Sequence, residues 1–94
     1  MPYSITISRT ALRQLRRLDP QARSRVRARI AALADEPRPS GVVKLTGEQH
    51  TWRLRIGDYR VLYDVDDGAQ AVDVVTLGHR REVYRRDRPP PDRR

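Results

Sequence analysis

The 94-residue chain contains no cysteine, so neither a disulfide framework nor a thiolate zinc site can form. No apolar run approaches the roughly 20 residues that a membrane-spanning helix requires. Residues 1–10 also lack the basic and then apolar layout of a signal peptide. We therefore expect a cytoplasmic protein that does not use a membrane and whose core is held together by packing alone.

Lysine is almost absent, since Lys44 is the single lysine among 20 basic residues and the others are arginines. The 12 acidic residues leave a net charge of 20 − 12 = +8. Arginine binds phosphate through a planar fork and stacks on bases, so this bias favours nucleic acid or an acidic partner. An arginine-rich proteome would give the same composition, and only the positions of the arginines can distinguish the two explanations.

Three familiar kinds of catalytic motif are also missing. The chain has no glycine-rich phosphate loop, no spaced His/Cys or paired-carboxylate metal motif, and no serine-centred nucleophile pattern. We therefore predict no cofactor and no metal site.

The first third of the chain predicts one strand and two helices. Residues 3–8 alternate between apolar and polar types, which is the period of a half-buried strand. Residues 9–18 repeat their apolar side chains at helical spacing, with Ser8 as the N-cap. Asp19 caps a second helix that begins at the following proline and ends before residue 37, so the two helices form an antiparallel hairpin.

The remainder of the chain predicts an antiparallel sheet and a tail. Residues 42–45 fit either a short edge strand or an extended connection, and three clearer strands follow, separated by the dipeptides Gly57-Asp58 and Asp67-Gly68. We expect an α+β domain over residues 1–86, with an antiparallel sheet of three to four strands. Residues 87–94 are rich in proline and arginine and predict a flexible tail.

A two-residue turn at Gly57-Asp58 would place Arg55 directly opposite Arg60, and Arg53 opposite Leu62. Like charges opposite each other destabilise a sheet by roughly 0.2 to 1 kcal/mol, so a sheet built only for stability would avoid this pair. The apolar residues of the hairpin fall on the other face, which should pack against the helices: Trp52, Leu54, Ile56, Tyr59, Val61 and Tyr63. Either the arginines extend harmlessly into water, or this face binds an anion.

The same turn logic at Asp67-Gly68 pairs Val61 with Val74 and Arg60 with Val75. Val75 and Leu77 would then share the face of the arginines. Such a groove, with an apolar floor and a basic wall, suits a flexible polyanion.

The segment "LGHRREVYRR", residues 77–86, follows the last predicted strand and contains His79, Arg80 and Tyr84. The strand order can return this segment beside Arg55 and Arg60. A cluster of arginine, histidine and tyrosine without a carboxylate pair can support phosphoryl transfer within RNA, where the neighbouring 2′-hydroxyl is the nucleophile.

The order of elements, together with "KLTGEQHTWRLRIGDYRVLYDVDDG" and "LGHRREVYRR", resembles the RelE/ParE superfamily of bacterial toxins. The likeness covers about residues 2–86 and is strongest to the RelE-like mRNA interferases. It implies a type II toxin that enters the ribosomal A site, cleaves mRNA without metal, and is held inactive by a cognate antitoxin with an acidic or amphipathic segment. Two alternatives remain open: a ParE-like toxin that inhibits gyrase, and a non-catalytic basic module that binds RNA or protein.

The resemblance also implies roles for individual residues. The matching positions are the two basic residues of the first hairpin strand, the arginine of the second strand, a C-terminal arginine and a terminal tyrosine: Arg53, Arg55, Arg60, Arg80 and Tyr84. Some members carry lysine at the first two positions. Because arginine does not deprotonate at physiological pH, the general base here would be Tyr84 or His79. The unperturbed pKa of histidine lies nearer neutral pH, whereas the pKa of a tyrosine would have to be lowered by the arginines.

Overall fold

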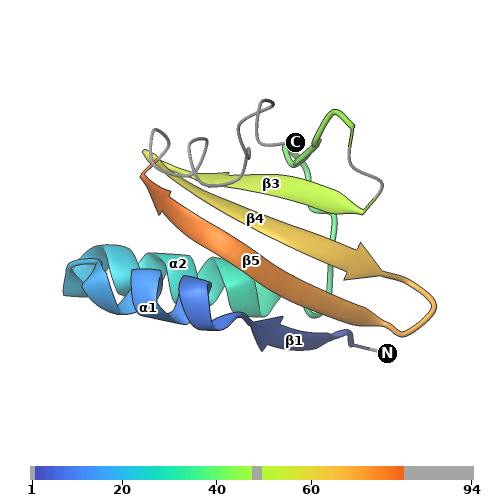
Figure 1. Cartoon of the computed structure of the whole chain (residues 1–94), viewed down its shortest axis with the longest axis horizontal. Coiled ribbons are helices and arrows are strands. Elements are labelled where there is room, and N and C mark those ends of the chain that lie inside the picture. Colours follow the sequence, from blue (N-terminus) through green and yellow to red (C-terminus); the bar gives the residue numbers. More distant parts are fainter. Residues whose placement is uncertain (1, 48–49, 80–94) are drawn as a thin grey trace, which may run out of the picture.

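The computed structural model describes residues 2–47 and 50–79. Its elements, in chain order, are β1 (Ser4–Ile7), α1 (Arg9–Arg17), α2 (Pro20–Ala32), β2 (Val43–Lys44), β3 (Thr51–Ile56), β4 (Tyr59–Asp66) and β5 (Ala71–His79) (Figure 1). This order confirms the predicted α+β class. The predicted tail, residues 87–94, and the boundary at residue 86 lie outside the described residues.

Both helices begin where the local chemistry predicts. The Ser8 hydroxyl accepts a hydrogen bond of 3.0 Å from the Ala11 N–H at the start of α1. The Asp19 carboxylate accepts one of 2.7 Å from the Ala22 N–H at the start of α2, whose first residue is Pro20. Each cap satisfies a backbone donor that the helix itself leaves unpaired, which typically contributes about 1 kcal/mol.

The sheet has five strands in the order β1-β5-β4-β3-β2. β1 runs parallel to β5, with Ser4 opposite Ala71, whereas the other neighbours are antiparallel. The uncertain segment at residues 42–45 contains the short edge strand β2, which pairs with β3. The first strand of the chain therefore lies beside β5, the last strand described.

The core lies between the helices and one face of the sheet (Figure 1). Its buried members come from both helices and from β3, β4 and β5: Ala11, Leu15, Val26, Ile30, Leu33, Leu54, Ile56, Val61, Tyr63, Val65, Val72, Val74 and Leu77. Tyr3, Ile5 and Ile7 pack against this cluster, as the alternation of the first strand predicts. Within residues 2–47 and 50–79, no helix has the length and apolar character needed to cross a membrane.

Tyr63 is the largest fully buried side chain and joins β4 to the segment after α2. Its hydroxyl donates a hydrogen bond of 2.6 Å to the Pro37 carbonyl. Burial raises the pKa of Tyr63 from 10.0 to about 12. The folded state therefore keeps this proton at pH values where the unfolded chain has lost it.

We expect the wild type to lose about 2 kcal/mol of stability as the pH rises from about 10 to 12, because the folded state then binds more protons than the unfolded state. Tyr63→Phe should be less stable by about 1 kcal/mol at pH 7, since the Pro37 carbonyl loses its donor. Its further loss at high pH should be smaller than that of the wild type. Urea unfolding of both proteins at pH 7 and pH 11 measures the difference, and equal losses in the two would contradict the assignment to Tyr63.

Candidate functional site

The β3–β4 hairpin has the predicted register. Gly57 opens the two-residue turn with a φ of 61°, a backbone conformation that favours glycine. Arg55 lies opposite Arg60 and Arg53 lies opposite Leu62. The Arg55–Arg60 pair is one step beyond the pair that flanks the turn, so it is a non-hydrogen-bonded pair with its Cα atoms about 4.5 Å apart. We call Arg53, Arg55 and Arg60 the arginine face; it is the side of the sheet that the helices do not cover.

Arg60 is the unusual member of the arginine face. The residue is only 8% exposed, and its Nε and Nη1 atoms are buried with no hydrogen-bond partner in the part of the chain that the structure describes. Buried charged groups are almost always paired, since an unpaired one is costly. Across the sheet lies Gly78, which places no side chain beside the guanidinium. Arg60 therefore carries a charge that no described residue matches.

Its neighbours on the arginine face have different surroundings. Arg55 is exposed, and its Nε donates a hydrogen bond of 3.3 Å to the Gly57 carbonyl, which holds the side chain near the turn. Arg53 is half-buried and has interactions of its own. Leu62, opposite Arg53, is fully buried but does not belong to the core cluster formed with the helices. The arginine face therefore has the guanidinium groups of Arg55 and Arg60 near the turn and the apolar side chain of Leu62 farther from it.

The predicted register between β4 and β5 is wrong. Val61 pairs with Leu77, not Val74, and Arg60 pairs with Gly78, not Val75. Leu77 consequently lies in the core beneath the helices. Leu77 is therefore absent from the arginine face, and the predicted apolar floor of Val75 and Leu77 does not form.

Two local features shift this register by three residues. The connection after Asp66 has four residues in place of two, because Asp66 accepts a hydrogen bond of 3.1 Å from the Ala69 N–H and Gln70 adopts a φ of 53° before β5 begins. The register then shifts once more at a bulge between Leu62 and Tyr63. The dipeptide Asp67-Gly68 lies within this longer loop and does not form a tight turn by itself.

His79 lies on the other side of the sheet from Arg60. It pairs with Tyr59, and the two rings are edge to face with centroids 6.3 Å apart. Both residues line a cavity of about 290 Å³ together with Gln14 and Arg17 of α1. The structure thus brings Arg53, Arg55 and Arg60 together on one face and places His79 on the other. The other two predicted site residues, Arg80 and Tyr84, lie outside the described residues.

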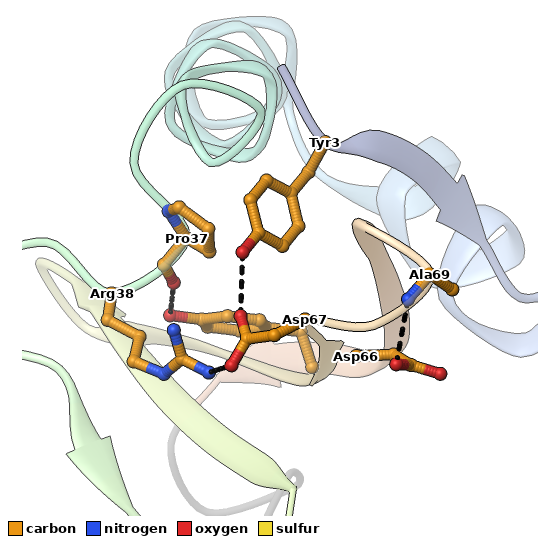
Figure 2. Close-up of polar contacts among 7 residues, drawn as sticks. Tyr3, Pro37, Arg38, Asp66, Asp67 and Ala69 are labelled. Atoms are coloured by element: carbon orange, nitrogen blue, oxygen red, sulfur yellow. Dashed lines mark hydrogen bonds and ion pairs between the residues drawn. The ribbon is translucent and has the colours of Figure 1, made fainter. Parts of the chain in front are cut away.

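A second polar cluster, at the opposite end of β4, was not anticipated from the sequence (Figure 2). The Tyr3 hydroxyl donates a hydrogen bond of 2.6 Å to Asp67, and the Arg38 guanidinium forms an ion pair of 2.7 Å with the same carboxylate. These two partners lower the pKa of Asp67, with Arg38 the larger cause. Arg38 also lies 5.4 Å from the centre of the Trp52 ring.

This cluster ties together three separate parts of the chain: the segment before β1, the segment after α2 and the loop after β4 (Figure 2). Asp67 neutralises the charge of Arg38, so this cluster does not extend the arginine face. Its contacts hold these parts of the chain together. No sequence signal links Tyr3 to a residue 64 positions away. Among the described residues, no group of three His, Cys, Asp or Glu side chains could hold a metal ion.

Residues 5–84 match the family of the ParE toxin of the type II toxin-antitoxin system parDE. The chain is also 33% identical to toxin RelG of Mycobacterium tuberculosis over 87 residues, which cover 92% of this chain and 100% of that protein. This chain belongs to the RelE/ParE superfamily of toxins. Toxin RelE of the same organism is 33% identical to this superfamily member over 85 residues, covering 89% of this chain and 88% of that protein.

Solved structures of the superfamily have the same fold. The toxin-antitoxin complex RelBE2 from Mycobacterium tuberculosis matches with a TM-score of 0.75 and 31% identity, covering 84% of this chain and 92% of that one. The archaeal RelE-RelB complex from Pyrococcus horikoshii OT3 matches with a TM-score of 0.73 and 27% identity, over 85% and 97% of the two chains. The protein is therefore a RelE-family toxin of a type II toxin-antitoxin system, as the resemblance implied.

Proposed function

We propose that this RelE-family toxin is an endoribonuclease that cleaves mRNA in the A site of the ribosome and needs no metal ion. The observation that carries the proposal is Arg60, whose Nε and Nη1 atoms are buried without a hydrogen-bond partner among the described residues, opposite a second arginine on the side of the sheet that the helices do not cover. A phosphate of the RNA backbone supplies the negative charge and the acceptor oxygens that this guanidinium lacks.

In the proposed reaction Arg60 and Arg55 hold the scissile phosphate, with Arg53 on the same face. The 2′-hydroxyl attacks phosphorus, the new O2′–P bond forms, and the P–O5′ bond breaks as the departing 5′-oxygen takes up a proton from water. The arginines stabilise the negative charge that develops on the phosphoryl oxygens. Arg80 adds to this stabilisation, and Tyr84, as its phenolate, removes the proton of the 2′-hydroxyl.

The ribosome and an antitoxin complete the proposed system. The arginine face is too small to form a channel for mRNA, so the ribosome holds the substrate in the geometry that 2′-hydroxyl attack requires. The two solved structures named above are complexes of a toxin with its RelB antitoxin. We infer a cognate antitoxin for this chain as well, with an acidic or amphipathic segment that covers basic surface. Both partners would be met in the cytoplasm.

A ParE-like function is the second candidate, because the matching family carries the ParE name. A toxin of that type inhibits gyrase by binding and needs no catalytic cluster. Arg60 favours RNA cleavage over this alternative, since a guanidinium buried without a hydrogen-bond partner among the described residues is costly and protein binding does not require it. A non-catalytic basic module would bind RNA and leave it intact.

Primer extension on a defined mRNA in a reconstituted translation reaction tests the proposal. We expect cleavage within A-site codons by the wild type, and none with Arg60→Ala or when ribosomes are omitted. If a protein preparation that is toxic in cells leaves the mRNA intact in every lane, this result would contradict the interferase proposal. A gyrase supercoiling assay on the same protein would then test the ParE-like alternative.

A further inference from the structure

The side of the sheet that the helices do not cover continues past the arginine face to the other end of β4. Side chains two residues apart on a strand share one side, so Asp64 lies on the same side as Arg60. Asp64 is directly opposite Asp73 of β5. We call Asp64 and Asp73 the acidic pair. The residues that flank the two carboxylates along their strands belong to the core, so the acidic pair points away from the helices: Tyr63, Val65, Val72 and Val74.

The acidic pair is not neutralised by the described part of the chain. The Thr51 hydroxyl donates a hydrogen bond to Asp64, which fixes that carboxylate without removing its charge. Asp73 is exposed, and its side chain has no hydrogen bond or ion pair within residues 2–47 and 50–79. Like charges on directly opposite residues destabilise a sheet. The sheet therefore carries two unfavourable pairs on one side, Arg55–Arg60 near the β3–β4 turn and Asp64–Asp73 at the far end.

The two pairs are far enough apart to act on different parts of one RNA strand. Four residues separate Arg60 from Asp64 along β4, which corresponds to about 13 Å. This distance exceeds the Debye length of about 8 Å at physiological salt, so the acidic pair has little effect on a phosphate held at Arg60. A second phosphate placed over Asp64 would meet two carboxylates at close range, where salt screens the repulsion much less. An RNA strand that ran along β4 would therefore be repelled at its far end.

A path across the strands meets no such charge. Gly78, Arg60 and Arg55 form one row across β5, β4 and β3, and Gly78 has no side chain to block the approach to Arg60. The short strand β2 pairs only with Trp52 and Arg53, so none of the described strands lies beside Arg55. The buried Nε and Nη1 atoms of Arg60, which have no partner among the described residues, lie in the middle of this row and favour a phosphate there.

We propose that the acidic pair sets the direction of the bound mRNA. It excludes phosphates from the far end of the sheet, so the RNA strand crosses β4 at Arg60 and presents one phosphodiester for cleavage. This inference rests on the proposed function and deepens it, because it explains how a small basic site selects one bond of a flexible chain. Asp64 and Asp73 are positioning residues, since they act by repulsion and do not touch the reacting atoms.

The test variant is Asp64→Asn/Asp73→Asn. Asparagine has nearly the size of aspartate, and its amide oxygen can still accept the hydrogen bond from Thr51. The matched control is Asp35→Asn/Glu36→Gln, which removes two negative charges from exposed residues that follow α2. Both variants therefore have the same net charge and keep Arg60. Thermal melting shows whether each remains folded.

Binding of a short 2′-O-methyl oligouridine, followed by fluorescence anisotropy, is the first measurement. This RNA has no free 2′-hydroxyl and is not cleaved. At about 0.05 M salt we expect the test variant to bind it at least about threefold more tightly than the control, because the far end of the sheet then accepts phosphates as well. Equal affinities would overturn the proposal. Equal affinities together with weaker binding of the test variant to the antitoxin would assign the acidic pair to a basic segment of that protein.

Primer extension on programmed ribosomes, at single-nucleotide resolution, is the second measurement. We expect the wild type and the control to cleave mainly at one position of the A-site codon, and the test variant to cleave at neighbouring positions as well. A loss of stability alone would lower the total cleavage without moving its position. An unchanged position in the test variant would overturn the proposal. The binding measurement needs neither ribosomes nor cleavage, so its failure is distinguishable from a failure of the proposed function. If the double variant melts below the wild type, Asp73→Asn decides against Asp35→Asn, with the same direction of change expected.

Discussion

Replacing Arg60 with methionine is expected to abolish RNA cleavage and, at the same time, to make the folded toxin more stable. Arg60 is 8% exposed, with two buried nitrogen atoms that have no partner among the described residues. Methionine fills a similar volume without a charge, so the free energy of unfolding should rise by about 1 to 3 kcal/mol. Cleavage should fall by at least about 10²-fold, the typical loss when one donor to a developing oxyanion is removed.

Arg55→Met is the matched control for this experiment. Arg55 lies directly opposite Arg60 but is exposed and bonded to the Gly57 carbonyl, so its replacement should change stability by less than about 1 kcal/mol. Urea unfolding at pH 7 and primer extension on translating ribosomes would be measured for both variants. A drop in the stability of Arg60→Met below that of the wild type would show that the guanidinium supports the fold and would remove the observation on which the proposed function rests.

The second large effect concerns the general base. Tyr84→Phe should lower the cleavage rate by about 10² to 10⁴-fold, the usual contribution of a positioned acid or base. His79→Ala should retain cleavage within a few-fold, because His79 contacts Tyr59 and lies on the other side of the sheet from Arg60. The sequence left the base open between these two residues. The pairing of β4 with β5 places His79 away from Arg60, and the role of Tyr84, which lies outside the described residues, stays a proposal.

Single-turnover cleavage on programmed ribosomes, followed over a range of pH, separates these two variants. Thermal melting of each provides the check that both remain folded. An inactive, folded His79→Ala variant would contradict the assignment and return histidine to the reaction. Full activity of Tyr84→Phe would exclude the tyrosine hydroxyl as the base.

The β3–β4 hairpin shows what could be predicted from the sequence. Gly57-Asp58 forms a turn of two residues, and with the turn length known, the alternation of apolar residues and arginines determines every cross-strand pair. The Arg55–Arg60 pair, which carries the proposed function, follows from this local rule. The caps of both helices were predictable for the same reason, since each involves residues three positions apart.

The pairing of β4 with β5 shows where prediction from the sequence ends. A hydrogen bond from the Ala69 N–H to Asp66 lengthens the loop, and a bulge beside Leu62 shifts the strand once more. Neither feature has a distinct sequence signal, yet together they move Leu77 into the core and set Gly78 opposite Arg60. The contact between Tyr3 and Asp67 is equally invisible, because it depends on how the whole sheet assembles.

The position of β1 has a consequence for how the toxin is made. β5 is the last strand described, but it has β1 on one side and β4 on the other, so the sheet stays incomplete until residues 71–79 have been synthesised. Pairing over such a long sequence separation is slow compared with helix formation. We expect the nascent chain to remain harmless to the ribosome that produces it, since Arg60 is not yet covered by its neighbours. Limited proteolysis of chains arrested at residue 70 tests this, and a protected core in those chains would contradict it.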